Sequence, residues 1–341
     1  MTTPDFGQDA SPAFFIGDVA LDEYFTADRW PGLGDKAMLQ PLATYVGGSI
    51  ANAAAVHAGY GAPTEFVSLL NRGEGSRRLC AELAAGGVGV AHMLHDETMP
   101  DSRTIVVLVD GEHAVLIPEL GDAPMILPDA TLAALRRPGF LYATPGRIRR
   151  LRASGMDALA VLRSAQAAGR QVVYDLDVEG VDPRDEPFLR GARAVIVNRI
   201  GFSASFAGWS DERIIEWMRR REIGMLAATL AAEGCRAYVP DRTIAVPGLA
   251  VSVVDVTGAG DTFGGSLVYA LERTDDPAVA LRFANAAGAA SVTRRGPRAG
   301  VGSAANVLAF MAAHGQPGGS EFDCLRTQGD DRDATDTTGR R

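Results

Sequence analysis

The chain has 341 residues, 47% hydrophobic and 22% charged, which is enough to bury a substantial core. A formal net charge of -9 disfavours nucleic acid or an anionic membrane surface as a partner. No apolar run approaches the length of about 18 residues that a membrane span needs, and the three cysteines lack CxxC spacing, so we expect a cytoplasmic protein.

The first part of the chain alternates short strands, turns and helices. Residues 1–12 are polar and predict a flexible tail. The hydrophobic patterns then predict buried strands at residues 13–16 and 64–70 and an exposed strand at 38–46. They predict helices at residues 50–58 and 76–85. Two β runs flank Asp110-Gly111 within residues 102–120, which indicates a hairpin. Excursions at about 18–48 and 100–120 are suited to form a small β lid.

From about residue 139, short apolar strands alternate with helical patterns. The strands are expected at residues 140–143, 171–175, 194–198 and 225–230. Repeated βα units of this length predict a parallel sheet with helices on both faces. A further β run is expected at 249–254, and the last helices at 258–273, 278–293 and 304–313. Residues 314–341 are rich in charge and poor in apolar side chains, so we expect disorder there and one α/β domain over residues 13–313.

The segment Val254–Gly265, VDVTGAGDTFGG, carries the strongest chemical signal. Gly258 and Gly260 permit a sharp turn and leave backbone amides unobstructed at a helix start, where the helix dipole favours an anion. A phosphoryl group in transfer needs such donors for its equatorial oxygens. Asp261 lies in the same first turn and can accept a proton from a hydroxyl. A plain glycine turn followed by a first-turn acid is the competing interpretation.

Two other phosphate-binding motifs are excluded. A Walker-type loop requires Gly-Lys-Ser/Thr, and the only lysine of the chain, Lys36, lies between Asp35 and Ala37. A GxGxxA match at Gly32 and Gly34 follows a Trp-Pro pair and leads into a β run, so it lacks the strand–turn–helix context of a dinucleotide site.

A second constellation is GGSIANAAA at residues 47–55. Its glycine pair lets a strand turn abruptly into a helix, and its alanines allow close packing. Asn52 can both donate to and accept from hydroxyl groups, and Asp22 could accept sugar hydroxyls in the same crevice. A local backbone bond for Asn52 and a solvated loop position for Asp22 stay open as alternatives.

Together these segments resemble the ribokinase-like carbohydrate kinases, also called the phosphofructokinase B family. GGSIANAA at 47–54 and DVTGAGD at 255–261 match that family's two hallmark segments in the right order. Shorter similarities extend the resemblance over about residues 13–313. It implies a doubly wound, mainly parallel α/β sheet flanked by helices, with a small β-sheet lid.

The resemblance also implies ATP-dependent phosphorylation of a hydroxyl on a hexose, ketose or sugar acid, with magnesium and potassium as cofactors. Asp261 would be the base, and the anion hole would consist of the backbone amides of Gly258, Ala259 and Gly260. The substrate would be held by Asp22, Gly48 and Asn52. The nucleotide would lie along Asn198, Thr229, Gly234 and Asn285. A monovalent cation would lie at Asp255 and Thr257. Arg103, on a lid strand, could bind a phosphate or sulfonate of the substrate.

One departure from the family pattern concerns magnesium. The family usually has Asn-x-x-Glu at a strand end, and both polar side chains organise the water shell between magnesium and the phosphates. Here Asn198 is followed by Arg199, Ile200 and Gly201, so the glutamate is missing. The base and the anion hole are unaffected by this change.

Two other functions are compatible with the motifs. A nucleoside kinase of the same fold would need an aromatic lid pocket, and only 7% of the residues are aromatic. A sugar-binding regulatory protein with weak or no turnover would account for Gly201, but it leaves the intact Asp261 turn unexplained. An exposed strand edge at residues 38–46 would suit a homodimer formed through the lid.

Overall fold

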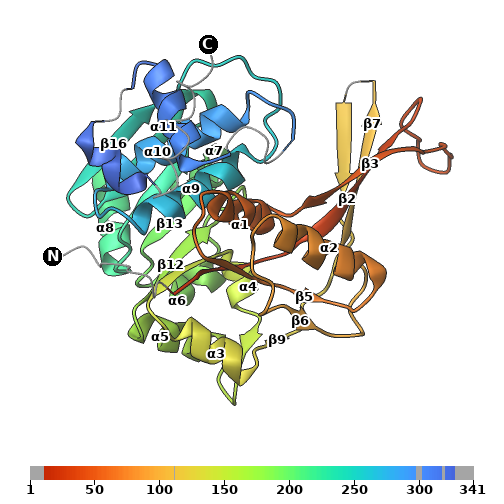
Figure 1. The fold of residues 1–341 in the computed structure, drawn as a ribbon, viewed down its shortest axis with the longest axis horizontal. Coiled ribbons are helices and arrows are strands. Elements are labelled where there is room, and N and C mark those ends of the chain that lie inside the picture. The colour runs from red at the N-terminus through yellow and green to blue at the C-terminus, as the bar shows by residue number, and fades with distance from the viewer. Residues whose placement is uncertain (1–10, 111, 297–301, 317–318, 327–341) are drawn as a thin grey trace, which may run out of the picture.

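A computed structural model describes residues 11–110, 112–296, 302–316 and 319–326. Its centre is an eight-stranded sheet with the order β16-β15-β14-β13-β12-β10-β1-β4 (Figure 1). The strands are β1 (Ala13–Ile16), β4 (Thr64–Val67), β10 (Gly139–Ala143), β12 (Arg170–Asp175), β13 (Ala194–Asn198), β14 (Leu226–Thr229), β15 (Gly234–Val239) and β16 (Arg242–Pro247). Neighbours from β4 to β14 are parallel, whereas β15 and β16 form an antiparallel edge. The predicted doubly wound, mainly parallel sheet is confirmed.

Helices cover both faces of this sheet, as the alternation of buried strand residues requires. In β1, Phe15 packs into one core cluster, while Phe14 and Ile16 pack into the other. The first cluster lies under α1 (Ser49–Gly59), α2 (Glu74–Ala85), α9 (Ala259–Leu271), α10 (Pro277–Ser291) and α11 (Ala304–Ala313). The second lies under α3 (Asp129–Leu135), α4 (Pro145–Ile148), α5 (Ala158–Ala167), α6 (Glu186–Leu189), α7 (Arg199–Phe206) and α8 (Asp211–Arg220).

The lid is a separate four-stranded sheet of order β3-β2-β7-β8 that projects from the body (Figure 1). Its strands are β2 (Ala20–Thr26), β3 (Gln40–Gly47), β7 (Arg103–Val109) and β8 (Glu112–Leu116). The antiparallel β7–β8 pair confirms the hairpin expected at residues 102–120. Asp110 adopts φ 51, a left-handed conformation that aspartate tolerates better than most residues.

Short pairs complete the elements: β5 (Leu69–Leu70) with β6 (Leu94–His95), and β9 (Met125–Ile126) with β11 (Leu151–Arg152). Three short 3-10 helices span Pro183–Asp185, Ala231–Glu233 and Ser320–Leu325. Within the described ranges, no helix has the length and apolar character needed to cross a bilayer.

The strand expected at residues 249–254 does not form. These residues are an irregular loop, and Val253 and Val254 are 61% and 58% exposed. Their β-branched side chains suit a strand, but the sheet ends at the β15–β16 hairpin, which the sequence reading did not identify as such. A β run without a neighbouring strand has no ladder to join.

The disorder predicted from residue 314 onward is wrong for residues 319–326. Phe322 and Leu325 are 1% and 0% exposed and belong to the core cluster under α9 and α10. The Tyr269 hydroxyl donates to the Leu325 carbonyl at 2.9 Å, and Arg282 lies 4.7 Å from the centre of the Phe322 ring. Two apolar side chains three residues apart are therefore enough to dock this segment. Residues 1–10 and 327–341 of the predicted tails lie outside the described residues.

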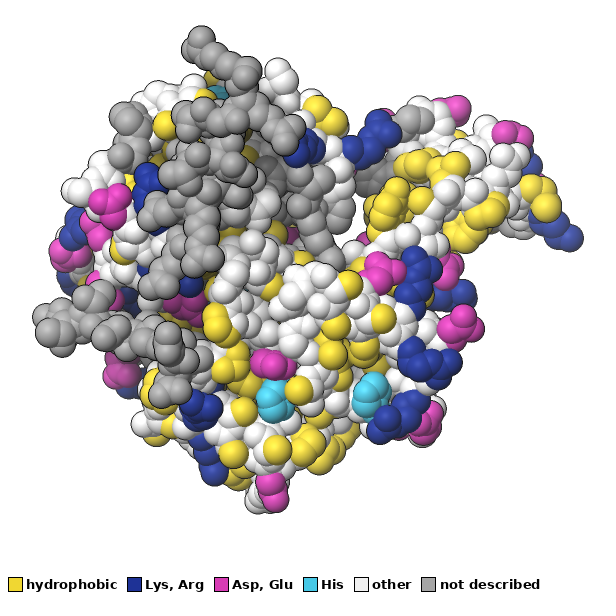
Figure 2. Space-filling view, in the orientation of Figure 1, with side chains coloured by type: hydrophobic (Ala, Val, Ile, Leu, Met, Phe, Trp, Pro, Cys, Tyr) yellow, Lys and Arg dark blue, Asp and Glu magenta, His cyan; other side chains and the backbone are white. Residues whose placement is uncertain are grey.

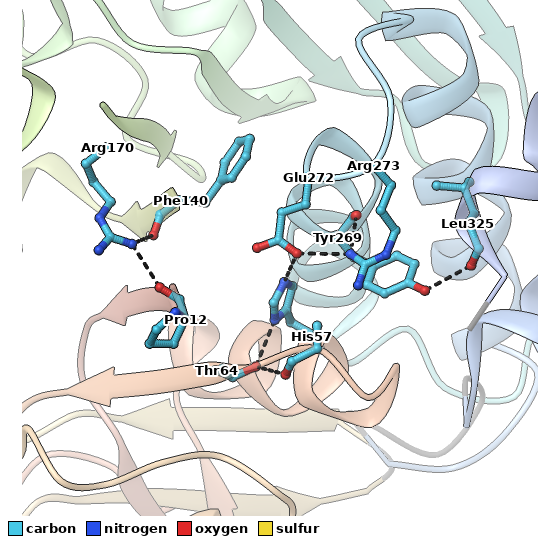
Figure 3. A network of polar contacts seen from close by, with 10 residues as sticks. Pro12, His57, Thr64, Phe140, Arg170, Tyr269, Glu272, Arg273 and Leu325 are labelled. Atoms are coloured by element: carbon cyan, nitrogen blue, oxygen red, sulfur yellow. Dashed lines mark hydrogen bonds and ion pairs between the residues drawn. The ribbon is translucent and has the colours of Figure 1, made fainter. Parts of the chain in front are cut away.

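A buried polar network ties α1, β4 and α9 together (Figure 3). The fully buried His57 ring contacts the Thr64 hydroxyl at 2.8 Å and the Glu272 carboxylate at 3.2 Å. Arg273 donates to the same carboxylate at 3.0 Å and stacks on Tyr269. Burial raises the pKa of Glu272, but His57 and Arg273 outweigh it and hold the pKa below its ordinary value.

We expect Glu272→Gln to lower the free energy of unfolding by about 1–3 kcal/mol near neutral pH, because His57 and Arg273 lose a charged acceptor. A depressed carboxyl pKa contributes stability that is present above the unfolded value of about 4.3 and is lost as pH falls through the folded value. Denaturant unfolding between pH 3 and pH 7 should therefore show a shallower acid loss in the variant. Glu97→Gln, at an exposed ion pair with Arg72, is the matched control. Equal pH slopes for Glu272→Gln and the wild-type protein would contradict this account.

Candidate active site

The start of α9 provides an anion-binding turn. Gly258 precedes the helix with φ 75 and ψ 7, a left-handed conformation that glycine adopts without strain. Within the described residues, the Gly258 and Gly260 amides donate to no protein acceptor, whereas the Ala259 amide reaches the Val256 carbonyl at 3.3 Å. A Cβ built on Gly260 would meet nothing within 4 Å. Two bare amides and one weakly engaged amide are thus available at a helix N-terminus.

Asp261 lies in the first turn of α9 and is held by a side chain from α1. The Asn52 amide donates to Asp261 Oδ2 at 2.7 Å. The pKa of Asp261 is raised to about 7, chiefly by burial; the hydrogen bond from Asn52 lowers it, and the charges of Asp175 and Asp177 raise it. A carboxyl group with a pKa near neutrality is suited to accept a proton at physiological pH. Asn52, predicted to contact substrate, is thus also a partner of the predicted base.

The backbone before α1 places the substrate-side residues. Gly48 has φ 105, and a Cβ there would lie 2.4 Å from the Asp18 carbonyl oxygen, so glycine is required. A Cβ on Gly47 would lie 1.9 Å from a carboxylate oxygen of Asp22, which shows that Asp22 covers this turn from β2. Asp22 and Gly48 therefore lie at the turn where the lid joins the body, and the Asn52 backbone amide donates to the Gly48 carbonyl at 2.9 Å in the first turn of α1.

Arg103 does not join that group. It aligns with Leu21 in the β2–β7 ladder, whereas Asp22 aligns with Thr104. Because successive strand residues face opposite sides of a sheet, Arg103 lies on the lid face opposite Asp22. The acid paired with it is Glu23, at 3.9 Å.

The residues predicted to bind the nucleotide lie on four elements. Asn198 and Thr229 end β13 and β14, Gly234 begins β15, and Asn285 lies in α10. Asn198 and Thr229 are register partners in the parallel ladder. Asn198 caps α7 by accepting from the Ile200 and Gly201 amides, both at 3.0 Å. Gly234 has φ 93, and a Cβ there would collide with the Val246 carbonyl. Asn285 is buried and donates to the Pro247 carbonyl at 3.0 Å, so its amide is already engaged in the protein.

Asp255 organises the loop before the anion-binding turn. Its carboxylate accepts the amides of Thr257 and Gly296, each at 2.9 Å. Burial raises the pKa of Asp255, but these two hydrogen bonds, the Thr257 side chain and the charge of Arg295 together lower it below its ordinary value. The Asp255 carboxylate, with its lowered pKa, is a ligand that a monovalent cation could use. No cluster of three or more His, Cys, Asp or Glu side chains in the described ranges is arranged to hold a metal ion.

Sequence reasoning missed three residues near Asp261. The Tyr142 hydroxyl, at the end of β10, donates to Asp175 Oδ2 at 2.7 Å. Burial raises the pKa of Asp175 to about 6. Asp177 accepts from the Asn198 amide at 2.8 Å and is electrostatically coupled to Asp261. One feature of the sequence could have identified these acids: Asp175 ends a buried strand of a predicted parallel sheet. Folds of this kind bind ligands at the carboxyl ends of such strands.

The protein is an α/β protein with a candidate phosphate-binding active site. This description rests on the doubly wound sheet, the β lid, the free amides at the start of α9 and the neighbouring carboxylates. The family model described as pfkB family carbohydrate kinase matches residues 15–304. The chain therefore belongs to the pfkB family of carbohydrate kinases.

Individual relatives agree with this family. The chain is 30% identical over 307 residues to the bifunctional protein HldE of Azorhizobium caulinodans, covering 84% of this chain but 62% of that protein's length. It is 29% identical over 298 residues to fructokinase-1 of Oryza sativa subsp. japonica, covering 78% of this chain and 88% of that protein. Because the chain spans only 62% of HldE, the activity of the whole HldE protein is not assigned to this chain.

Solved structures show the same fold. A ribokinase of Arabidopsis thaliana complexed with ribose and ATP matches with a TM-score of 0.76 and 23% identity, covering 88% of this chain and 98% of that one. A fructokinase of Xylella fastidiosa with bound ATP matches with a TM-score of 0.71 and 22% identity, covering 89% and 99%. These likenesses establish the ribokinase-like architecture.

Two glycines of α9 should respond oppositely to alanine. Gly260→Ala places a methyl in open space, so we expect stability to be unchanged or higher by up to about 1 kcal/mol from helix propensity. Gly265→Ala places Cβ 2.3 Å from the Ala53 carbonyl oxygen, and we expect a loss of about 1–3 kcal/mol or more as α1 and α9 separate. Thermal unfolding of both variants tests this, and similar melting temperatures would contradict the helix contact described.

Proposed function

We propose that this protein transfers the γ-phosphoryl group of ATP to a hydroxyl of a sugar, a hexose, ketose or sugar acid. The observation that carries the proposal is Asp261, with a pKa near 7, placed beside the unengaged amides of Gly258 and Gly260. Charge that builds on the transferred phosphoryl would be met by backbone donors that need no rearrangement. The same carboxylate would take the proton that the attacking oxygen loses.

The proposed reaction is an in-line displacement. The substrate oxygen forms a bond to the γ-phosphorus, the bond from that phosphorus to the β–γ bridging oxygen breaks, and ADP leaves with the electron pair. The hydroxyl proton passes to Asp261. Asn52 orients the Asp261 carboxylate, and Asp22 and Gly48 hold the sugar beneath the lid. Closure of the lid would exclude water, which would otherwise compete as the acceptor.

The proposed cofactors are magnesium with ATP and potassium. Magnesium would neutralise charge on the β- and γ-phosphates, and it prefers carboxylate and water oxygens of the kind that Asp175 and Asp177 provide. Potassium would bind near Asp255 and the Thr257 carbonyl and would stabilise the loop that shapes the amide turn. The nucleotide would lie along the ends of β13 and β14, near Asn198 and Thr229, with Gly234 and Asn285 shaping the adjoining backbone.

The lid also supports a proposed homodimer. Figure 2 shows hydrophobic side chains gathered on the projecting lid. The exposed apolar residues on or next to the edge strands β3 and β8 include Leu42, Leu116 and Ile117, which are 54%, 48% and 74% exposed. Exposed edges with apolar side chains favour pairing with a second copy. Light scattering in solution that gave the mass of one chain at micromolar concentration would reject this dimer.

We expect Asp261→Asn to bind ATP normally and to lose phosphoryl transfer by roughly 10²–10⁴-fold, because the general base is removed while the amide turn remains. The measurement is ADP release over a panel of sugars, sugar acids and nucleosides, with and without potassium. The Gly260→Ala variant keeps every backbone amide but adds a methyl group beside the turn, so it tests whether the amides must stay unobstructed. A nucleoside substrate would favour the nucleoside kinase alternative. Sugar binding without ADP release from the wild-type protein would favour the regulatory alternative.

The pH dependence of kcat/KM should show an acid limb centred near pH 7, because Asp261 must be ionised to act and its pKa lies at about 7. Since the Asn52 hydrogen bond lowers that pKa, Asn52→Leu should move the limb to higher pH, apart from any loss of substrate affinity. Asp175 is coupled to Asp261, so the limb reports the pair. A limb near pH 4 in the wild-type protein would contradict a pKa near 7 for Asp261.

A further inference from the structure

Asp177 is held in one position by three hydrogen bonds. Its amide donates to Asp175 Oδ1 at 3.0 Å, its carbonyl accepts from the Asn198 amide at 3.3 Å, and its Oδ1 accepts from the Asn198 side chain at 2.8 Å. Its φ is 46, in the left-handed region that residues other than glycine adopt uncommonly, aspartate and asparagine more often than most. An exposed acid is thus fixed between the ends of β12 and β13, although the fixed backbone is strained.

The space for this arrangement comes from Gly201. A Cβ at position 201 would lie 2.3 Å from the Asp177 carbonyl oxygen and 2.9 Å from the Gly180 amide. Gly180 has φ 69, and its own Cβ would lie 2.5 Å from the Gly201 carbonyl. The loop after β12 therefore packs directly on the first turn of α7. Any side chain at position 201 would displace Asp177. The lack of a glutamate at position 201 and the location of the Asp177 carboxylate are therefore structurally linked.

The carboxylate of Asp177 has a free oxygen in an acidic environment. Its Oδ2 makes no hydrogen bond or ion pair with any residue in the described part of the chain. The charges of Asp175 and Asp177 both raise the pKa of Asp261, and the charges of all three acids raise the pKa of Tyr142. A triphosphate entering beside the amides of α9 would add further negative charge. A cation between carboxylates and phosphates would remove this repulsion.

We propose that Asp177 positions the magnesium ion of Mg·ATP, directly or through its bound waters, and so supplies from the β12 loop the carboxylate that position 201 lacks. This inference rests on the proposed kinase function. Magnesium at nucleotide sites typically uses one or two protein carboxylates together with phosphates and waters, so no three-carboxylate cage is needed. Asn198 then acts as a positioning residue: its side-chain NH₂ group donates to Asp177, and its side-chain Oδ1 caps α7.

A purely structural role for Asp177 makes a different prediction. An acid near the start of α7 could serve only to favour the helix dipole and to anchor Asn198. Asp177→Asn separates the two roles, because asparagine keeps an Oδ1 acceptor and tolerates positive φ while it removes the charge. Glu179→Gln, an exposed acid two residues further along the same loop, is the matched control for loss of one negative charge.

The test is isothermal titration of ATP into the whole chain, without metal and at several magnesium concentrations. For Asp177→Asn we expect the magnesium concentration at half-maximal enhancement of ATP binding to rise about tenfold to a hundredfold. Metal-free ATP should bind more tightly than to the wild-type protein, because one repulsive charge is gone. Glu179→Gln should match the wild-type protein in both measurements. If Asp177→Asn folds poorly, Asp177→Gly keeps the positive φ and gives the same readout.

The outcomes separate this inference from the function on which it rests. A wild-type protein that binds Mg·ATP and phosphorylates a sugar, with the same magnesium dependence in Asp177→Asn, overturns the role of Asp177 alone. Failure of the wild-type protein to bind ATP at any magnesium concentration overturns the proposed function and this inference with it. A change of equal size in Glu179→Gln also overturns it, since general electrostatics would then suffice.

Discussion

The close approach of α9 to α1 and to the sheet is the constraint on which the candidate site depends. A Cβ on Gly265 would lie 2.3 Å from the Ala53 carbonyl oxygen, and one on Gly264 would lie 2.1 Å from the Tyr142 hydroxyl. Both contacts require glycine, and together they seat the first turns of α9 low against α1 and β10. Only at this depth can Asn52 reach Asp261 at 2.7 Å. The motif glycines beyond the turn are therefore packing residues as much as turn residues.

The same depth explains the electrostatics of the site. Burial and the neighbouring acids raise the pKa of Asp261 to about 7, and burial raises that of Asp175 to about 6. A base whose pKa matches the working pH combines availability with proton affinity. A cation arriving with the nucleotide would lower both pKa values and so increase the ionised fraction of Asp261. Substrate loading and activation of the base would thus be coupled through charge alone.

The sequence predicted what depends on local chemistry and missed what depends on distant partners. The buried strands and the residues of the DVTGAGD and GGSIANAA segments could be recognised, because their periodicity and glycine spacing are local. The run at 249–254 was wrongly assigned to a strand, since β propensity does not reveal that the sheet edge is already taken by β16. Residues 319–326 dock through two apolar side chains, too few to alter the composition of the tail. Asp177 could not be placed, because its partner Asn198 is 21 residues away along the chain.

Position 201 shows why a missing motif residue is weak evidence for a lost function. If the chain had merely lost its glutamate, the space beside α7 would be open, and nothing would require Asp177 to adopt a left-handed backbone. Instead the loop fills that space, and Asp177, in a left-handed backbone conformation, lies close enough to Asp261 for its charge to raise the pKa of that carboxyl. The raised pKa of Asp261 and the left-handed backbone of Asp177 each lower the stability of the ligand-free protein near neutral pH. In the proposed reaction, the cation that arrives with the nucleotide would offset the first of these costs, because it favours the ionised form of Asp261. This favours a nucleotide-using enzyme over a protein that only binds sugar.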